Sequence, residues 1–441
     1  MGNKKVAVYT LGCKVNQYES AVIEALFRER GYQTVAFEDR ADVYIINTCT
    51  VTHLGDRKSR QMIRRAIRKN PGALIAVTGC YAQTSPEEIL KIPGVDLLVG
   101  TRNRARLVDL VETAVKGAGP LNEVTGFEAG DEFEEIPVLP VQGRVRAYLK
   151  IQEGCNNFCT YCIVPYARGP VRSRRAEKVL GAARALVNAG YKEIVLTGIK
   201  TGWYGKDVDG EPDLTGLLRR LSGIPGLFRL RLSSIEPNDI TFELVETLAA
   251  AEVFCRHLHV PLQSGDDRVL ASMGRRYTTG EYARLVEVLR TKLPGLGLTT
   301  DVMVGFPGET EENFANTCRF IENISFSGLH VFKFSPRRGT PAANFENQVA
   351  PGIKEERSRR LIRLGEALAG RFAAAHLGKE LEVLAEQPWE KDGGMYEGRT
   401  GDYLRVAFPA NGDLRGEIVR VKAEKLKGNL LLGRIIKLNV E

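Results

Sequence analysis

The feature that most constrains this chain is a compact cysteine array, GCNNFCTYCIVPYARG, in residues 154–169. It places Cys155, Cys159 and Cys162 in a C-x₃-C-x₂-C pattern. Three thiols this close cannot all pair as disulfides, because one is left over, but they can bind a metal or an iron–sulfur cluster. A cubane cluster normally takes four cysteines, so three leave one iron open to another ligand. The array therefore predicts a cluster whose open iron binds a substrate or cofactor directly.

A structural zinc knuckle is the alternative reading of the same cysteines. Such a site takes four protein ligands. The next Cys or His along the chain after Cys162 is the distant Cys255, so no fourth ligand lies close in sequence. The pattern favours the cluster over zinc.

The array also carries a resemblance to a known family. With the aromatic residue Tyr161 directly before the last cysteine, it resembles the radical S-adenosylmethionine (SAM) superfamily. The resemblance implies that the amino and carboxylate groups of SAM chelate the open iron. It also implies that one electron from the reduced cluster breaks a C–S bond of SAM and releases a 5′-deoxyadenosyl radical.

Composition sets the broad class of the protein. Of 441 residues, 43% are hydrophobic and 26% charged, which suits two or three globular domains. The formal net charge of +8 permits a polyanionic partner without proving one. We find no signal-peptide pattern and no apolar run of the roughly 18 residues that a membrane span needs. We therefore expect a cytoplasmic protein with reduced thiols and no membrane partner.

The first predicted domain covers residues 1–118. Strand-like runs alternate with helical runs, which is typical of a parallel α/β sheet. The predicted strands are 6–9, 43–46, 73–77 and 97–99, and the predicted helices are 18–30, 56–69, 86–91 and 104–115.

Three further cysteines of this domain occupy equivalent places. Cys13, Cys49 and Cys80 each follow directly after a predicted strand. Because the carboxyl ends of parallel strands share one edge of a sheet, we expect the three thiols to converge there. The alternative is that they are three small buried apolar residues, as free cysteines often are. Their shared position favours a second cluster with an open iron.

The residues around these cysteines carry the second resemblance. The stretches TLGCKVNQYES (residues 10–20) and NTCTVT (residues 47–52) resemble the N-terminal domain of the methylthiotransferases. Those enzymes use two [4Fe–4S] clusters, of which the auxiliary one holds the sulfur to be inserted. The resemblance implies that Cys13, Cys49 and Cys80 bind the auxiliary cluster.

Two basic runs are candidates for contacts with anions. Residues 57–69, RKSRQMIRRAIRK, carry seven cations and no acid, so they form either an RNA-binding helix face or a solvated one. Residues 168–175, RGPVRSRR, follow the cysteine array and could hold the carboxylate of SAM or RNA phosphates. Between the domains, residues 119–143 are rich in Gly, Pro and acids, and we expect a linker.

The second predicted domain covers residues 144–372. Six predicted strands, 147–152, 193–198, 228–234, 257–262, 298–305 and 328–335, alternate with helices. Six β/α units give a partial (β/α)₆ barrel resembling the radical SAM core. Active sites of parallel barrels lie at the carboxyl ends of the strands, and the cysteine array follows the first strand.

Residues at the other strand ends are predicted by resemblance to bind SAM. Glu236 suits a ribose or amino contact, or alternatively caps a helix. Gly305 lets the backbone approach the adenine, and Phe306 either stacks on a base or belongs to the core. His259 either faces the cavity or is a satisfied core residue. The implied cofactor-binding set is completed by Tyr161, Ser234, Gln263 and Val304.

The third predicted domain covers residues 373–441. Five short strand patterns, 380–386, 395–400, 403–408, 417–427 and 429–436, predict a small β-barrel. It resembles the TRAM RNA-binding domain, which is oligonucleotide-binding-fold-like. The alternative is a barrel for docking or oligomerisation.

The resemblance, which covers nearly the whole chain, implies one function above others. The chain is expected to be a tRNA methylthiotransferase that converts N6-threonylcarbamoyladenosine at position 37 to its 2-methylthio derivative. SAM would serve as methyl donor and radical source, and an electron donor and a sulfur donor would be further partners. Isopentenyladenosine in tRNA and a ribosomal-protein aspartate are alternative substrates. A non-catalytic iron–sulfur protein that binds RNA or senses redox state is the alternative of another class. No catalytic residue is predicted.

Overall fold

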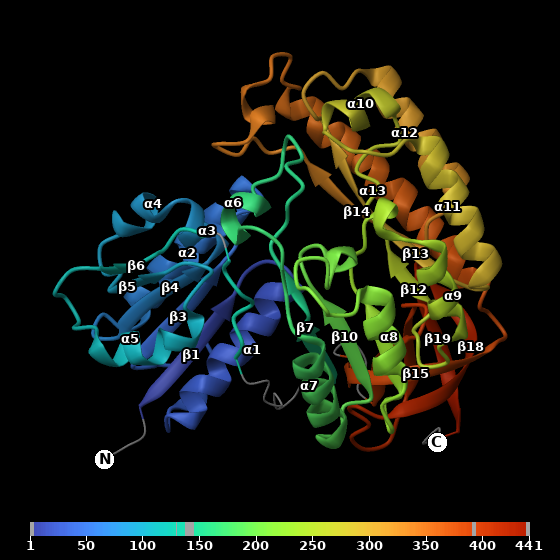
Figure 1. Cartoon of the computed structure of the whole chain (residues 1–441). Helices are drawn as coiled ribbons and strands as arrows, with labels where there is room; N and C mark the ends of the chain where they lie inside the picture. The colour runs from blue at the N-terminus through green and yellow to red at the C-terminus, as the bar shows by residue number, and fades with distance from the viewer. Residues whose placement is uncertain (1–3, 129, 137–144, 390–393, 438–441) are drawn as a thin grey trace.

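Three parts of the chain surround a common cavity in the computed structural model (Figure 1). The model describes residues 4–128, 130–136, 145–389 and 394–437. The α/β class predicted from the sequence is confirmed, together with its C-terminal β-barrel. Of the predicted linker, residues 129 and 137–143 lie outside the described residues, as do residues 1–3, 144 and 438–441 at the predicted domain boundaries.

The N-terminal part is a six-stranded parallel sheet in the order β2-β1-β3-β4-β5-β6. Its strands are β1 (Lys5–Thr10), β2 (Gln33–Val35), β3 (Val43–Thr48), β4 (Leu74–Gly79), β5 (Leu97–Val99) and β6 (Leu121–Glu123). The sheet therefore extends past the domain boundary predicted at residue 118. The short strands β2 and β6 lack the apolar run that marks the other strands of this sheet in the sequence.

Helices cover both faces of this sheet, which explains its uninterrupted apolar strands. They are α1 (Lys14–Glu29), α2 (His53–Lys69), α3 (Cys80–Thr84), α4 (Pro86–Leu90), the 3-10 helix η1 (Arg104–Arg106) and α5 (Leu107–Thr113). Neighbouring residues of β3 belong to opposite cores, with Ile46 in one and Ile45 in the other. The two cores hold the strand ends, and hence Cys13, Cys49 and Cys80, at a fixed edge.

The central part is the predicted six-stranded partial barrel. Its strands are β7 (Arg146–Lys150), β10 (Glu193–Thr197), β11 (Arg229–Leu232), β12 (His257–His259), β13 (Gly297–Val304) and β14 (Gly328–Lys333). All paired neighbours are parallel, and Ser234 bridges to His259 where β11 meets β12. No pairing joins β7 to β14 within the described strands, so the barrel is open on one side, where α1 contacts β7.

Helices form the outer layer of the partial barrel and share one large apolar core with its strands. After the short helix α6 (Val164–Arg168), they are α7 (Ala176–Asn188), α8 (Leu214–Ser222), α9 (Phe242–Ala250), α10 (Asp267–Ser272), α11 (Thr279–Lys292), α12 (Glu311–Ile324) and α13 (Pro351–Ala374). A short antiparallel pair, β8 (Gln152–Glu153) with β9 (Arg172–Ser173), brackets the cysteine loop.

The C-terminal part is a closed five-stranded barrel in the order β15-β16-β17-β19-β18. Its strands are β15 (Glu380–Pro388), β16 (Met395–Thr400), β17 (Arg405–Pro409), β18 (Ile418–Lys427) and β19 (Leu430–Lys437). Helix α13 contacts both β14 and β19, so it ties the small barrel to the central part. In Figure 1 the small barrel, in red, lies below the strands of the central part.

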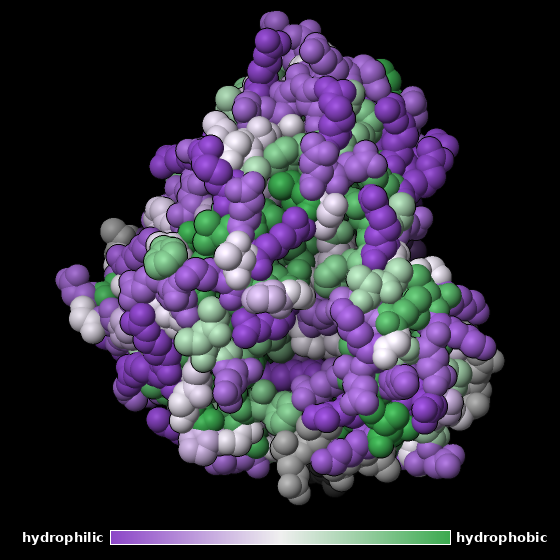
Figure 2. Space-filling view, turned by 90° about the vertical axis from the view of Figure 1, so that its right-hand side faces the viewer, coloured by the Kyte–Doolittle hydropathy of each residue, from purple (hydrophilic) through white to green (hydrophobic). Residues whose placement is uncertain are grey.

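The surface is largely hydrophilic. On the face drawn in Figure 2, hydrophilic residues cover most of the rim and hydrophobic residues gather in the hollowed middle. None of the helices in the described ranges combines the length and the apolar character needed to cross a bilayer.

Candidate active site between the three parts

The first cysteine trio lies on the loop between β8 and α6. The loop is fixed locally, because Cys162 N–H donates to the Cys159 carbonyl, and Thr160 N–H donates to the carbonyl of Met273 beyond α10. All three cysteines are free thiols. Burial, together with the smaller effect of the neighbouring thiols Cys159 and Cys155, raises the pKa of Cys162 to about 12. A cation or metal bound here is therefore needed to stabilise the thiolates.

The second trio converges at the carboxyl edge of the N-terminal sheet, as its sequence positions predict. Cys13 caps α1, Cys49 follows β3, and Cys80 is the first residue of α3. Gly12 has a φ of +107°, and a Cβ on it would lie 3.2 Å from the Cys49 sulfur. Glycine is thus needed at this position for both backbone conformation and space. Burial raises the pKa of Cys80 to about 12.

The spacing of the sulfur atoms bears on the kind of group that each trio fits. Across the described residues, neither trio brings its three sulfurs within 4.8 Å of one another. A tetrahedral zinc ion with bonds of about 2.3 Å would hold them about 3.8 Å apart. The wider, all-thiolate donor sets fit an iron–sulfur cluster better than a single zinc ion.

Arg168 connects the two trios. It ends α6, just after the first trio, and its Nε donates a hydrogen bond to the Cys80 sulfur at 3.2 Å. Its guanidinium also binds Glu153 at 2.7 Å, Asn16 at 2.8 Å and Glu19. The loop of one trio therefore supplies a hydrogen-bond donor to the other.

Around Arg168 lies a buried network of charges between the N-terminal and central parts. Glu19 and Glu153 are its carboxylates, and Arg104 and Lys150 are its other main cations. All of these side chains are at most 3% exposed. Although burial raises the pKa of Glu19, the charges of Arg104, Arg168 and Lys150 lower it to about 2. Removing one partner would leave a buried charge uncompensated, which typically costs about 3–5 kcal/mol.

The acidic segment predicted as a linker takes part in this interface. Glu134 pairs with Arg104, and Glu135 pairs with Arg174 at 2.8 Å. Phe133 and Ile136 of the same segment are buried. In the described residues of 119–136, the acids therefore neutralise arginines of the two parts that they join.

This pairing also accounts for most of the basic run 168–175. Arg168 and Arg174 are bound to glutamates, and Arg172 donates to two carbonyls of its own loop. Arg175 is 60% exposed and lies 3.7 Å from Glu211. The expected role of these arginines toward SAM or RNA remains a prediction, and three of the four hold protein groups.

Two predicted SAM contacts lie beside the first trio. Glu236 forms an ion pair with Arg275, whose Nη1 donates to the Cys159 sulfur at 3.6 Å. Tyr161 is packed against Phe306, with ring centroids 6.5 Å apart. Burial raises the pKa of Tyr161 well above its ordinary value, so its hydroxyl stays protonated.

The remaining predicted SAM contacts lie at or after the carboxyl ends of β11, β12 and β13. Phe306 and Val304 have no exposed surface, and Phe306 packs in an aromatic cluster with Phe334 and Phe345. Gly305 has a φ of +70°, and a Cβ on it would overlap Lys354. Of the other two predicted contacts, Gln263 lies beside β13 and has a φ of +65°. Ser234 lines the cavity.

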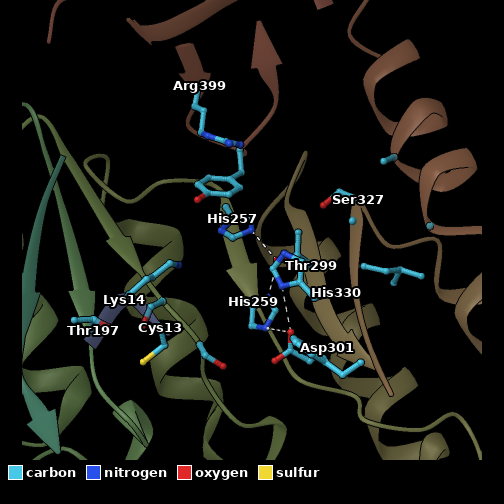
Figure 3. Close-up of a pocket in the computed structure, with 18 of the residues that line it drawn as sticks. Cys13, Lys14, Thr197, His257, His259, Thr299, Asp301, Ser327, His330 and Arg399 are labelled. Atoms are coloured by element: carbon cyan, nitrogen blue, oxygen red, sulfur yellow. Dashed lines mark hydrogen bonds and ion pairs between the residues drawn. The ribbon is translucent and has the colours of Figure 1, made fainter. Parts of the chain in front are cut away.

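A cavity of about 1120 Å³ lies where the three parts meet. Cys13, Lys14 and Cys49 line it from the N-terminal part, and Arg399 and Tyr403 line it from the small barrel. The central part contributes the inner face of the partial barrel, including Ser234, His257, His259, Thr299, Asp301 and His330. Figure 3 shows Cys13 and Lys14 on one side of the cavity and the β12–β14 residues opposite them.

A histidine–aspartate cluster forms one wall of this cavity. Asp301 Oδ1 lies 3.2 Å from both His259 Nε2 and His330 Nδ1 (Figure 3). Burial raises the pKa of Asp301, but hydrogen bonds to the two imidazoles lower it below its ordinary value. His259 therefore faces the cavity, which is one of the two positions that the sequence allowed for this residue. Asp301 and His330 were not predicted as site residues. The burial of β13 alternates along the strand, and Asp301 lies on its less buried side.

Comparison with known proteins gives the family. The sequence matches "Uncharacterized protein family UPF0004" over residues 5–100 and "Radical SAM superfamily" over residues 149–321. The threonylcarbamoyladenosine tRNA methylthiotransferase MtaB of Bacillus subtilis (strain 168) is 49% identical over 423 residues, 95% of this chain and 94% of that protein. This chain belongs to the radical SAM methylthiotransferases.

Other relatives agree with that assignment. A tRNA-2-methylthio-N(6)-dimethylallyladenosine synthase of Moorella thermoacetica is 38% identical and matches 98% of both chains. The radical SAM methyltransferase TsrM of Kitasatospora setae has a TM-score of 0.58 at 17% identity, covering 77% of this chain and 75% of that one, and so shows the fold alone. The cofactors of this methylthiotransferase are SAM and two [4Fe–4S] clusters, as the sequence predicted.

Proposed function

We propose that this methylthiotransferase adds a methylthio group to C2 of N6-threonylcarbamoyladenosine at position 37 of tRNA, in the cytoplasm. The observation that carries the proposal is the 49% identity over 95% of the chain to the Bacillus subtilis enzyme. The 38% identical relative is named for a dimethylallyladenosine product instead, so the choice of adenosine needs a direct test.

We assign one cluster to each cysteine trio. Cys155, Cys159 and Cys162 hold the cluster that works with SAM, and the strand-end trio Cys13, Cys49 and Cys80 holds the auxiliary cluster. When bound, SAM and the clusters supply the methyl group, the sulfur and a 5′-deoxyadenosyl radical. An unactivated adenine C2–H bond does not yield to acid–base chemistry, which is why a radical suits the reaction. The electron and sulfur for the reaction come from partner molecules.

The chain's own groups prepare these sites. Arg275 donates to the Cys159 sulfur and Arg168 donates to the Cys80 sulfur, so each trio receives one cationic N–H donor. Hydrogen bonds to cluster sulfurs stabilise the more negative state and tune the potential. The three parts surround the cavity, and a substrate bound in it would exclude water that could quench a radical. Contacts of Tyr161, Ser234, Glu236, Gln263 and residues 304–306 with SAM remain predictions.

Two exposed surfaces suit RNA. On α2, Arg57, Arg64 and Arg68 are exposed and have no ion-pair partner among the described residues. In the loop of the first trio, Phe158 is 66% exposed, and its ring lies 5.8 Å from that of the exposed Tyr166. Unpaired cations bind phosphates, and exposed aromatic rings stack on unpaired bases.

Nucleoside mass spectrometry of tRNA tests the proposal. Deleting the gene should abolish 2-methylthio-N6-threonylcarbamoyladenosine, and the intact gene should restore it. Cys13→Ala and Cys155→Ala should each fail to restore it, and each purified variant should hold about four irons per chain instead of about eight. Cys318→Ala is the matched control, because Cys318 lies on α12 away from both trios. Unchanged tRNA after deletion would refute the proposal.

A further inference from the structure

One end of the cavity gathers positive charge from all three parts of the chain. Lys14 comes from α1 and His257 from the start of β12. Arg399 comes from strand β16 of the small barrel, and Tyr403 comes from the turn between β16 and β17. We call these four residues the cationic end. Figure 3 shows Arg399 above His257, with Lys14 reaching in from the opposite side.

The polar groups of the cationic end are incompletely paired. No hydrogen bond or ion pair joins Lys14 to any described residue, and the Arg399 guanidinium donates no hydrogen bond to them. The nearest carboxylate oxygen to Arg399 is that of Glu386, 3.7 Å away. His257 is 3% exposed, and its Nδ1 has no hydrogen-bond partner. Buried polar groups in native structures are normally paired, so unpaired ones point to a ligand.

The charges around this end do not balance. Of the cations around this end, Arg231 pairs with Glu193 and Arg229 pairs with Glu382. Glu386 is shared, because it lies 3.2 Å from Arg146 and 3.7 Å from Arg399. Lys14 has no ion-pair partner among the described residues, and Arg399 has only this shared carboxylate. Burial raises the pKa of Tyr403, yet the charges of Arg146, Lys14 and Arg399 lower it below its ordinary value. This positive electrostatic potential favours the binding of an anion at the cationic end.

The aromatic wall of the cationic end is held under strain. Tyr403 has a φ of +75°, a conformation that costs energy for a bulky residue and clusters at functional sites. Its ring stacks on His257 with centroids 4.6 Å apart. Arg231 fixes the turn by donating to the carbonyls of Thr400 and Gly401. The small barrel therefore presents a rigid surface to the cavity.

We propose that the cationic end binds the carboxylate of the N6 substituent of the substrate adenosine, through Lys14 and Arg399. This inference rests on the proposed function and deepens it. C2 and C6 lie on either side of N1 in the six-membered ring of adenine, and C6 carries the exocyclic nitrogen N6. A base whose C2 faces the Cys13 side of the cavity therefore keeps its N6 group inside the same cavity.

A backbone phosphate is the other anion with suitable chemistry. Phosphates belong to a long polymer, and they are bound most readily at open surfaces such as the exposed face of α2. The cationic end lies in a recess where three parts of the chain meet and suits a group carried on a single base. A carboxylate there would gain charge-assisted hydrogen bonds from Lys14 and from Arg399, neither of which donates a side-chain hydrogen bond to a described residue.

The inference is tested with three anticodon stem-loop RNAs and the cluster-loaded protein. One RNA carries N6-threonylcarbamoyladenosine, the second carries its carboxyl methyl ester, and the third carries N6-isopentenyladenosine. The ester differs from the acid chiefly in charge. Affinities are measured anaerobically without SAM by fluorescence anisotropy, and product formation is measured separately with SAM.

Wild-type protein should bind the acid RNA roughly 10- to 100-fold more tightly than the ester RNA. Arg399→Gln and Lys14→Met should reduce that ratio to nearly one by weakening only the acid RNA, and Arg399→Lys should retain part of it. The exposed Arg220, on the outer helix α8, supplies the control Arg220→Gln, which should keep the wild-type ratio. Iron content and the cluster absorption spectrum show whether Lys14→Met disturbs the neighbouring Cys13. Arg399→Gln lies away from both trios and gives the result independently.

Two outcomes would overturn the inference. Equal binding of acid and ester RNAs by the wild-type protein would show that the carboxylate is not recognised. Equal losses for both RNAs in Arg399→Gln would place a phosphate at the cationic end instead. In either case, methylthiolation of the acid RNA would leave the proposed function standing. Methylthiolation of the isopentenyl RNA alone would refute the proposed function itself.

Discussion

The two cysteine trios are built in opposite ways. Cys155, Cys159 and Cys162 share one loop, and that loop is fixed by contacts within the central part. Cys13, Cys49 and Cys80 come from three strand ends and converge only when the parallel sheet has formed. The first trio thus depends on local structure, whereas the second depends on tertiary structure.

The arginines beside the two cysteine trios also differ, because one is held within a single part of the chain and the other is held between two parts. Arg275, beside Cys159, is held by Glu236 of the same part, and the side chain of Glu236 is 26% exposed. Arg168, beside Cys80, is held by Glu19 and Glu153 in a network that crosses between two parts and is fully buried. The comparison teaches that the surroundings of the second trio require correct docking of the N-terminal and central parts, and those of the first trio do not.

The largest expected effect comes from breaking the buried network. Arg168→Met leaves Glu19 and Glu153 without one of their cations and removes the donor to Cys80. It should destabilise the protein by about 3–5 kcal/mol in denaturant unfolding and lower the iron content toward one cluster. Arg275→Met should cost less, because water can solvate the partly exposed Glu236.

Arg168→Lys is the conservative control for this prediction. It keeps the charge in the network but loses the planar fork that binds several partners. Most of the stability should return, while the electron paramagnetic resonance signal or potential of one cluster remains shifted. Equal destabilisation by Arg168→Met and Arg275→Met would contradict the contrast between the two trios.

A smaller effect is expected on RNA binding by α2, the helix that follows Cys49 of the second trio. Changing Arg57, Arg64 and Arg68 of α2 to Gln together should weaken tRNA binding, because three unpaired cations of one helix face are lost. The slope of log affinity against log salt should fall by about 2 to 3. Arg65→Gln is the control, since Arg65 is already paired with Glu38 at 3.1 Å. An unchanged slope in the triple variant would show that these arginines of α2 face solvent and do not contact the tRNA.

The smallest effect concerns the docking of the small barrel, which closes the cavity beside Cys13. A hydrogen bond to Asp402, 2.9 Å away, raises the pKa of His376 above its ordinary value. A raised folded-state pKa stabilises the folded form fully below the unfolded value of about 6.5 and loses this contribution as pH rises through the folded value. Thermal unfolding between pH 6 and 8.5 should show this loss, and His376→Gln should remove it. The same pH dependence in the variant would argue against this pair.

Much of the fold could be predicted because its signals are local. Alternating apolar runs located the six barrel strands and the longer strands of the N-terminal sheet, and short alternating runs located the small barrel. The strands β2 and β6 were missed because they are short and lack the apolar run that marked the equally short, fully buried β5. The convergence of Cys13, Cys49 and Cys80 followed from the rule that parallel strands share their carboxyl edge.

The site itself was less predictable. The contact of Glu236 with SAM stays a prediction, and the sequence did not show that Glu236 pairs with Arg275. The contacts of the arginines of 168–175 with SAM or RNA also stay predictions, and the sequence did not show that Arg168 and Arg174 pair with glutamates. A charged residue shows its type in the sequence, but its partner is chosen by docking, and no spacing records that choice.

The sequence by itself determined the chemistry available to this protein: two sets of three thiols, one in a loop and one at strand ends, on an α/β framework. Periodicity and spacing act over short stretches, so they survive in the linear chain. The tertiary structure decided that Arg168 of one site reaches Cys80 of the other, and that Lys14, His257, Arg399 and Tyr403 meet in one cavity. These contacts join distant residues whose proximity exists only once the three parts have packed together.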